Sequence, residues 1–454
     1  MMTNFDDVAR RAGRYQATLA QRAVRPDAGS VAALPSLDLP LPATASTPAE
    51  IIAELDEFGA STVATTGGRY FGFVTGGVLP AAQGADMLVS AWGQNAAIDV
   101  MSPVAARLEE LALSWLADAL HLPATGGALV TGATMANFTG LAAAREALLA
   151  RKGWNVASQG LFGAPPLPVV VGQEVHVSMR KALSLLGLGK DRVIQVPVDA
   201  QGRMRPDAFP QLSEPAIVCL QAGNVNTGAF DPAHELIPLA RASQSWVHVD
   251  GAFGLWAAAS PARAHLMNGF ELADSWTTDA HKWLNAGYDC GIALLRDPAP
   301  LRDALDSPAS YLSHGQQRQP MHYTPESSRR ARGIPVWAAL KSLGRAGLTE
   351  LVERCCRHAV RFAEGLRAGG FEVLNDVILN QVLVSFGSSD ETRAVISAIQ
   401  EDGTCWCGST VWQGRTAMRI SVSSWATTDE DVARSLDAIL RVARQTLDQG
   451  GNHP

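Results

Sequence analysis

The chain has 454 residues, of which 47% are hydrophobic and 18% are charged, enough apolar material for two or three folded domains, which excludes global disorder. Its net charge of -7 argues against nucleic-acid binding, which depends on clustered cations. There is no apolar run of signal-peptide or membrane-spanning length, and six cysteines are few for this length. We therefore expect a soluble cytoplasmic protein without a zinc site or a membrane or nucleic-acid partner.

Residues 1–60 are predicted to form an N-terminal helical segment. Apolar side chains recur at helical spacing between Phe5 and Leu19, which indicates an amphipathic helix. The proline-rich stretch over residues 25–46 predicts an extended connector. Thr47 and Glu50 have the spacing of a capping box around a first-position proline, so a second helix should begin there.

Between residues 128 and 296, short β-branched runs alternate with helix-length segments. Runs that are apolar on both faces are typical of a mostly parallel sheet covered by helices. We therefore predict an α/β domain over residues 61–327 with a mostly parallel, seven-stranded sheet. The expected strands are Ala128–Thr131, Val169–Val171, Val193–Val196, Ile217–Leu220, Val247–Val249, Trp276–Thr278 and Ile292–Leu295.

A polar segment over about residues 307–327 is too long for an ordinary connector and is typical of a mobile active-site loop. After it, apolar periodicity predicts helices over residues 336–345 and 348–366. Further on, it predicts strands over residues 382–386 and 417–422, with a final helix from Asp429. Residues 328–454 are therefore expected to form a smaller C-terminal α+β domain.

Two expected strand ends carry a carboxylate and an amine. Asp250 follows Val247–Val249, and Lys282 follows Trp276–Thr278. Ligands bind at the carboxyl ends of strands in an open parallel sheet, so both side chains could face one crevice. A lysine amine can form a Schiff base with an aldehyde cofactor, and a carboxylate can keep its pyridine nitrogen protonated. Either residue alone is more often a surface charge, but the pair predicts a pyridoxal 5'-phosphate site.

The phosphate of such a cofactor needs a binding site of its own. Gly132, Ala133 and Thr134 follow a predicted strand and begin a helix. Backbone N–H groups and a hydroxyl at a helix N-terminus can hold an anion. A hydroxyl at this position is more often only a helix cap. This motif therefore indicates a phosphate site only in combination with Asp250 and Lys282.

The order of these motifs resembles the group II pyridoxal phosphate-dependent amino acid decarboxylases, which include aromatic amino acid, glutamate and diaminobutyrate decarboxylases. The similarity extends from about residue 70 to residue 431. It implies fold type I, with a large cofactor-binding domain and a small C-terminal domain. It also implies a homodimer with shared active sites, in which the N-terminal helices and the loop over residues 307–327 cross to the partner's site. The matching segments are Tyr70–Phe73, Gly76–Gly77, Ser102–Pro103, Glu174–Ser178, Gly223–Asp231, Asp274–Ser275, His281–Trp283, Ser328–Arg330 and Trp337–Lys341.

The resemblance also implies roles for single residues. Lys282 is the lysine of the internal aldimine, and Asp250 pairs with the pyridinium nitrogen. His176 stacks on one face of the cofactor ring, and Ala252 packs on the other. His176 taken alone could equally be a histidine satisfied within a loop.

Three further residues are assigned in the same way. Thr227 is a cofactor contact in the Gly–Thr turn. His281 contacts the phosphate or the substrate carboxylate, or braces Lys282. Tyr323 matches the loop tyrosine that protonates the substrate Cα after carbon dioxide leaves, a step for which a phenol is a plausible acid. A loop aromatic that only packs when the loop orders is the alternative interpretation.

Candidate substrate contacts come from more distant parts of the chain. Phe73 and Thr75 lie in the segment that lines the substrate pocket of the family. Trp92 lies in a stretch that a partner subunit would contribute. Arg419 lies where related enzymes bind a carboxylate, and arginine can hold a carboxylate through two parallel hydrogen bonds.

Together the residues and the resemblance predict decarboxylation of an L-amino acid to its amine and carbon dioxide. Another pyridoxal phosphate reaction is the first alternative, namely a carbon–carbon lyase, an aldehyde synthase or an aminotransferase, because fold and cofactor do not determine which Cα bond breaks. Tyr323 favours decarboxylation over aldehyde formation, since the related aldehyde-forming enzymes have phenylalanine there. A non-catalytic binding protein with the same fold is the second alternative.

Overall fold

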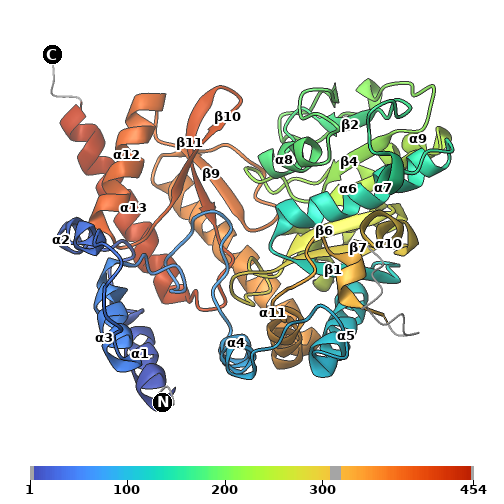
Figure 1. Cartoon of the computed structure of the whole chain (residues 1–454). Coiled ribbons are helices and arrows are strands. Elements are labelled where there is room, and N and C mark those ends of the chain that lie inside the picture. The colour runs from blue at the N-terminus through green and yellow to red at the C-terminus, as the bar shows by residue number, and fades with distance from the viewer. Residues whose placement is uncertain (1–4, 307–317, 451–454) are drawn as a thin grey trace. The chain divides into compact units, whose positions relative to one another are not determined.

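The computed structural model describes residues 5–306 and 318–450, which form two compact units (Figure 1). None of the described helices is both long and apolar enough to cross a membrane. The domain boundaries predicted after residues 60 and 327 stay predictions. The first unit joins the N-terminal segment through Thr75 to Arg361–Leu374 and to the segment from Leu383 onward, and the second comprises Gly76–Val360 and Asn375–Val382.

The second unit is built on a seven-stranded sheet of order β1-β7-β6-β5-β4-β2-β3. β7 is antiparallel to both of its neighbours, and the remaining pairs are parallel. The predicted mostly parallel, seven-stranded sheet is confirmed. The strands are β1 (Gly126–Val130), β2 (Val169–Gly172), β3 (Ile194–Val196), β4 (Ile217–Gln221), β5 (Trp246–Asp250), β6 (Ser275–Asp279) and β7 (Gly291–Leu295).

Both faces of this sheet are buried. Ala128 and Val130 of β1 belong to a hydrophobic cluster with α6 (Ala133–Ala150) and α8 (Val177–Leu185), helices that Figure 1 shows beside the sheet. Leu129 lies between them, so it points to the opposite face, and it is also completely buried. Burial on two faces explains why the strands read as continuous apolar runs rather than as alternating patterns.

The carboxyl ends of three strands lie along one edge of the sheet. Val130 at the end of β1 and Asp279 at the end of β6 both pair with Gly291 of β7. β5 runs parallel to β6 and ends at Asp250. The chain leaves this edge directly into α6 after β1, and into the turn that carries Lys282 after β6. The predicted site residues of these three strands therefore lie at one edge.

The other helices of this unit connect or cover the strands. The long α11 runs from Gly333 to Ala368 and is kinked at Gly344, whose φ of 58° is not helical. The two helices predicted over residues 336–345 and 348–366 are confirmed, because this non-helical residue separates two helices within α11. The remaining helices are α4 (Pro80–Trp92), α5 (Pro103–Ala119), α7 (Val156–Gln159), α9 (Ala233–Ala242) and α10 (Ala299–Leu305).

The first unit contains α1 (Phe5–Thr18), α3 (Pro48–Glu57) and a four-stranded sheet of order β10-β11-β9-β8. The helices α12 (Ser389–Asp402) and α13 (Asp429–Gly450) pack against each other, and α12 contacts β11. The predicted capping box of α3 is confirmed, because Thr47 and Glu50 bond each other's backbone N–H groups. The strands are β8 (Glu372–Val373), β9 (Gln381–Ser385), β10 (Gly408–Trp412) and β11 (Arg415–Ser421).

Two features of this unit differ from the sequence predictions. The connector predicted over residues 25–46 is not wholly extended, since it contains α2 (Ala28–Ala32) and a 3-10 turn over Leu34–Leu37. Asp27 caps α2 by accepting the N–H of Ser30 at 2.9 Å. The two edge strands, β8 and β10, were not predicted. β8 has only two residues, and the central residues of β10 are largely exposed and so lack an apolar pattern.

A buried carboxylate links α5 of the second unit to the segment that follows residue 317. Glu109 accepts hydrogen bonds from Arg329 at 2.6 Å and from Arg318 at 3.4 Å. Arg329 also donates to the carbonyl of Leu129 at 2.5 Å. The side chains of Glu109 and Arg329 are almost completely inaccessible to solvent.

Glu109→Gln is expected to lower the free energy of unfolding by about 3 kcal/mol, because it removes one charge from a buried ion pair and leaves the arginines uncompensated. Urea denaturation followed by circular dichroism measures this change. Glu110→Gln is the matched control, since Glu110 pairs with Arg107 at the surface and such pairs contribute little. Equal effects of the two substitutions would contradict the prediction.

Candidate active site

Lys282 lies in the turn after β6 and is held by a carboxylate. Its Nζ is 3.0 Å from Oδ2 of Asp279, and the two side chains are 16% and 2% exposed. Nε2 of His281 is 3.6 Å from the same oxygen. Oδ1 of Asp279 is buried, and none of the described residues donates a hydrogen bond to it. The turn thus holds an amine against a buried carboxylate that retains accepting capacity.

The Gly76–Gly77 motif packs directly against this turn. A Cβ atom at Gly76 would lie 1.8 Å from the carbonyl oxygen of Lys282, so no other residue fits there. The N–H of Gly76 donates to the carbonyl of His281 at 3.2 Å, and that of Gly77 donates to Oδ1 of Asn285 at 2.6 Å. The glycines therefore support the backbone that presents Lys282.

Asp250 is the last residue of β5 and is 5% exposed. Its carboxylate accepts hydrogen bonds from Nδ2 of Asn137 at 3.0 Å and from the N–H of Ala252 at 3.2 Å. The carbonyl of Ala252 in turn accepts the N–H of Asp279 at 2.9 Å. The predicted residues Asp250 and Ala252 are thereby joined to the segment that carries Lys282.

The start of α6 lies beside the same turn. A Cβ atom at Gly132 would lie 3.6 Å from Cε1 of His281 and 3.8 Å from Oδ1 of Asp279. No side chain caps α6 at Gly132, and the first N–H groups of a helix have no partner within it. The amides of Ala133 and Thr134 are therefore suited to hold an anion at this edge.

His176 is linked to this cluster through one serine. It is the N-cap residue of α8, and its Nδ1 accepts the N–H of Ser178 at 3.2 Å. The hydroxyl of Ser178 is 2.7 Å from the same nitrogen and accepts a long hydrogen bond from Asn137 at 3.5 Å. Asn137 thus touches the surroundings of both His176 and Asp250.

His281 is a buried imidazole. Burial lowers its pKa, with Asp279 opposing this effect, so the ring is mostly neutral at pH 7. The ring stacks on Tyr288 at 4.5 Å between centroids, and Nδ1 is 3.1 Å from the carbonyl of Cys290. Nδ1 must carry the proton of the neutral ring to donate to that carbonyl. His281 therefore supplies a neutral side chain beside Lys282.

Tyr323 ends a 3-10 turn over Pro320–Tyr323. Its ring packs at the edge of the hydrophobic cluster under α6, with the guanidinium of Arg318 4.6 Å from the ring centroid. Arg318 also donates to the carbonyl of Gly127 at 2.6 Å. Residues 307–317 of the predicted mobile loop lie outside the described residues. The proton-donor role of Tyr323 stays a prediction.

Two other predicted residues of this unit have different surroundings. The hydroxyl of Thr227 donates to the carbonyl of Gln201 at 2.7 Å and accepts the N–H of Ala229 at 3.2 Å, so it links its own turn to the turn that contains Gln201. Trp92 is the last residue of α4 and is 48% exposed. Their cofactor and substrate contacts stay predictions.

Three predicted substrate residues belong to the first unit. Phe73 stacks on Trp406 with a centroid distance of 5.3 Å, and Thr75 is buried. Arg419 lies on β11 opposite Gly408, and burial lowers its pKa. Their substrate roles likewise stay predictions.

Sequence reasoning missed two residues of this site. Asp279 precedes Lys282 by three residues, and that spacing in a turn is the signal that could have identified it. Asn137 is a completely buried amide on a helix whose buried residues are mostly alanine and leucine. A polar residue in such a pattern needs partners, but the sequence does not show which ones.

The residues present fit pyridoxal phosphate. Lys282 offers an amine for the aldehyde, Asp250 offers a buried carboxylate for the ring nitrogen, and the uncapped start of α6 offers amides for the phosphate. All three lie at one edge of one sheet within one unit. This donor set matches the three polar groups by which the cofactor is held.

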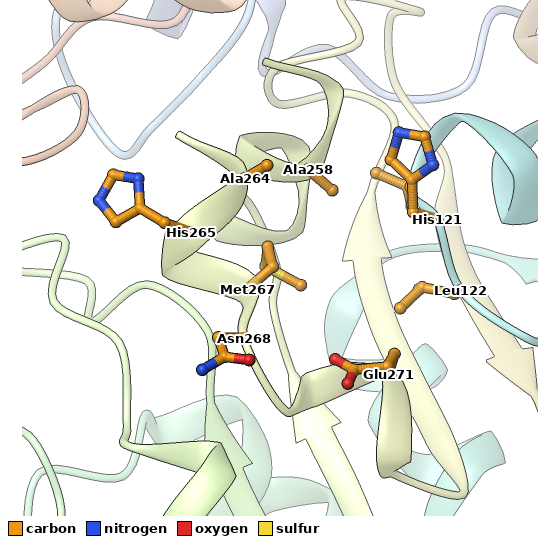
Figure 2. Close-up of a pocket in the computed structure, with 9 residues that line it drawn as sticks. His121, Leu122, Ala258, Ala264, His265, Met267, Asn268 and Glu271 are labelled. Carbon is orange, nitrogen blue, oxygen red and sulfur yellow. The ribbon is translucent and has the colours of Figure 1, made fainter. Parts of the chain in front are cut away.

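A separate pocket lies at the opposite edge of the sheet. It has a volume of about 480 Å³ and is lined by residues that include His121, Met267 and Glu271 (Figure 2). His121 precedes β1, and Glu271 precedes β6, so both lie near the amino ends of these strands. Lys282 and Asp250 lie at the carboxyl ends, and this pocket is therefore distinct from the candidate site.

The chain is similar to several known proteins. The chain is 30% identical to the L-2,4-diaminobutyrate decarboxylase of Rhizobium meliloti (strain 1021), over 80% of this chain and 75% of that protein. It is 28% identical to the 4-hydroxyphenylacetaldehyde synthase of Rhodiola rosea, over 76% and 74%. The crystal structure of Oryza sativa TDC with PLP and tryptamine superimposes with a TM-score of 0.87 at 24% identity, covering 98% and 99% of the two chains.

The structural likeness confirms the predicted fold. A family described as the pyridoxal-dependent decarboxylase conserved domain matches residues 33–387, which is more than half of the chain. This match includes the start of α6, the end of β5 and the Lys282 turn. The chain therefore belongs to the pyridoxal-dependent decarboxylase family.

Proposed function

We propose that this pyridoxal phosphate-dependent carboxy-lyase converts an L-amino acid to its amine and carbon dioxide, with Lys282 as the residue that attaches the cofactor. The observation that carries the proposal is the placement of Lys282, Asp250 and the start of α6 at one sheet edge. When bound, pyridoxal phosphate supplies a ring that accepts the electron pair left by the departing carboxylate.

Residues of the chain hold the cofactor and orient the substrate. Asp279 holds the amine of Lys282 in place, and Asp250 keeps a proton on the ring nitrogen. The amides of Ala133 and Thr134 bind the phosphate. His176 and Ala252 would hold the ring from its two faces, which would help to orient the substrate for cleavage.

A substrate panel tests the reaction class. The purified enzyme is incubated with the common L-amino acids and with L-2,4-diaminobutyrate, and carbon dioxide, amine, ammonia and aldehyde are all quantified. We expect carbon dioxide and amine in equal amounts, with little ammonia. Aldehyde and ammonia in place of the amine would identify an aldehyde synthase, and cofactor binding without turnover would identify a binding protein.

Tyr323 is proposed to donate the proton to the substrate Cα. Tyr323→Phe is expected to slow amine formation by about 10²-fold, since a positioned general acid contributes at least this much. Some product should shift to aldehyde, because dissolved dioxygen can oxidise the unprotonated centre, with ammonia and hydrogen peroxide as the other products. Single-turnover product analysis measures both effects. Unchanged amine formation without aldehyde would show that the tyrosine only packs against Arg318 and the core.

We also propose a homodimer with shared active sites. Its support is a group of exposed hydrophobic side chains on α4 and at the start of α5, two helices joined by the cluster of Val89 and Ala105. Light scattering should show a dimer, and Trp92→Glu should shift it toward monomers and lower activity. The exposed residues are Met87, Leu88, Trp92, Val100, Met101 and Val104.

A cytoplasmic location is proposed as well. All six cysteines are free and buried, a pattern that fits a reducing compartment. Fractionation of cells that produce the protein tests this location.

A further inference from the structure

A fully buried hydrogen-bonded chain leads from the middle of β5 to Asp250. Trp246, His248 and Asp250 alternate along β5, so all three point toward α6. Nε2 of His248 is 3.0 Å from Oδ1 of Asn137, and its Nδ1 is 2.8 Å from the hydroxyl of Ser275. The indole N–H of Trp246 donates to the same hydroxyl at 2.9 Å.

The partners determine the direction of every bond in this chain. Asn137 donates its Nδ2 to the Asp250 carboxylate, so its Oδ1 faces His248 and must accept. Nε2 of His248 therefore carries the proton, and Nδ1 accepts from Ser275. Ser275 in turn accepts from Trp246. Four successive groups thus donate in one direction, toward Asp250, and such chains strengthen each member.

The surroundings keep His248 in this neutral form. Burial lowers its pKa to about 4, and the nearby Asp250 only partly opposes this shift. The middle of α6 approaches the ring so closely that a Cβ atom at Gly140 would lie 2.6 Å from Cε1 of His248. The ring therefore has little freedom to turn, and its single proton stays on the side of Asn137.

We propose that His248 is a positioning residue for the pyridine-binding carboxylate. It orients the amide of Asn137, which in turn directs the Asp250 carboxylate to accept from the ring nitrogen of the cofactor. The inference rests on the proposed function, because it assigns Asp250 to that nitrogen. In this inference, Asn137, His248 and Ser275 support cofactor binding without contacting the cofactor.

Two substitutions of His248 distinguish a positioning role from simple packing. In His248→Gln, the amide nitrogen takes the place of Nε2 and can still donate to Asn137. In His248→Asn, the shorter amide takes the place of Nδ1 and keeps only the contact with Ser275. Both variants lose the imidazole ring, so their difference reports the bond to Asn137.

The readouts are the dissociation constant of pyridoxal phosphate and ¹⁵N NMR of cofactor labelled at the ring nitrogen. His248→Asn is expected to weaken cofactor binding about tenfold, because the buried amide oxygen of Asn137 loses its hydrogen-bond donor, and to reduce ring protonation. His248→Gln should stay within about twofold of the unmodified protein. Thermal unfolding of each variant verifies the fold.

A milder pair covers the case in which His248→Asn does not fold. Ser275→Ala removes the hydroxyl that fixes the histidine proton and should shift the ¹⁵N signal in the same direction. Ser245→Ala is its control, since this buried hydroxyl bonds the N–H of Ala216 outside the chain. A ring signal unchanged in His248→Asn and Ser275→Ala would overturn the inference. Absence of cofactor from the unmodified protein would instead overturn the proposed function.

Discussion

Replacing Lys282 with alanine is expected to reduce carbon dioxide release by at least about 10⁴-fold, because the residue that forms the covalent link acts as a unit with the rest of the site. Lys282 is the amine held at 3.0 Å from Asp279 at the sheet edge. After borohydride reduction, the unmodified protein should carry the cofactor on the peptide that contains residue 282. Mass spectrometry of the digested protein measures this attachment.

The ion pair and the covalent link can be separated. Lys282→Arg keeps a positive charge opposite Asp279 but cannot attach the aldehyde, so it should be as inactive as the alanine variant. Lys190→Ala is the control, since Lys190 is an exposed lysine remote in sequence from the site. Reduced cofactor on another peptide, or activity retained without Lys282, would refute the assignment.

Asp250→Asn is expected to lower the rate of decarboxylation by about 10³-fold, because a neutral amide cannot hold the ring nitrogen in its protonated, electron-accepting form. The substitution keeps the shape of the side chain. It replaces an acceptor with a donor at one of the two atoms that bond Asn137 and Ala252. The rate is measured as carbon dioxide release, and ¹⁵N NMR of the labelled cofactor reports ring protonation.

A carboxylate at the other end of the same strands provides the control. Asp274 precedes β6 and accepts the N–H of Val247 at 2.7 Å and a bond from Arg241 at 2.8 Å. Asp274→Asn should lower stability without changing the ring signal, because it lies at the opposite sheet edge. A full rate in Asp250→Asn, or the same ring signal in both variants, would contradict the role of Asp250.

The sheet could be predicted from sequence because each strand carries its own signal. All seven predicted runs became strands. For the six strands other than β3, burial on two faces requires an uninterrupted apolar segment. The Thr47 capping box was likewise readable, because its contacts span only three residues. The exposed strand β10 and the short helix α2 were not predicted, because neither has an apolar pattern in its sequence.

The site was only partly readable. Lys282 and Asp250 are charged residues that interrupt or follow apolar runs, and their order in the chain resembles a known family. Asn137 and His248 are 111 residues apart, yet their side chains meet at 3.0 Å. Nothing within a local window of sequence indicates such a pair.

The sequence by itself thus determined the seven strands of the large sheet and the helix start that suits a phosphate. It also determined the amine and the carboxylate that suit pyridoxal phosphate. Local apolar periodicity and residue chemistry carry that information. Only the tertiary structure decided that β7 runs antiparallel between β1 and β6 and that Asp279 holds Lys282. It also decided that four donors from α6, β5 and β6 line up behind Asp250. Those outcomes depend on strand order and on buried polar groups finding distant partners, which no spacing along the chain encodes.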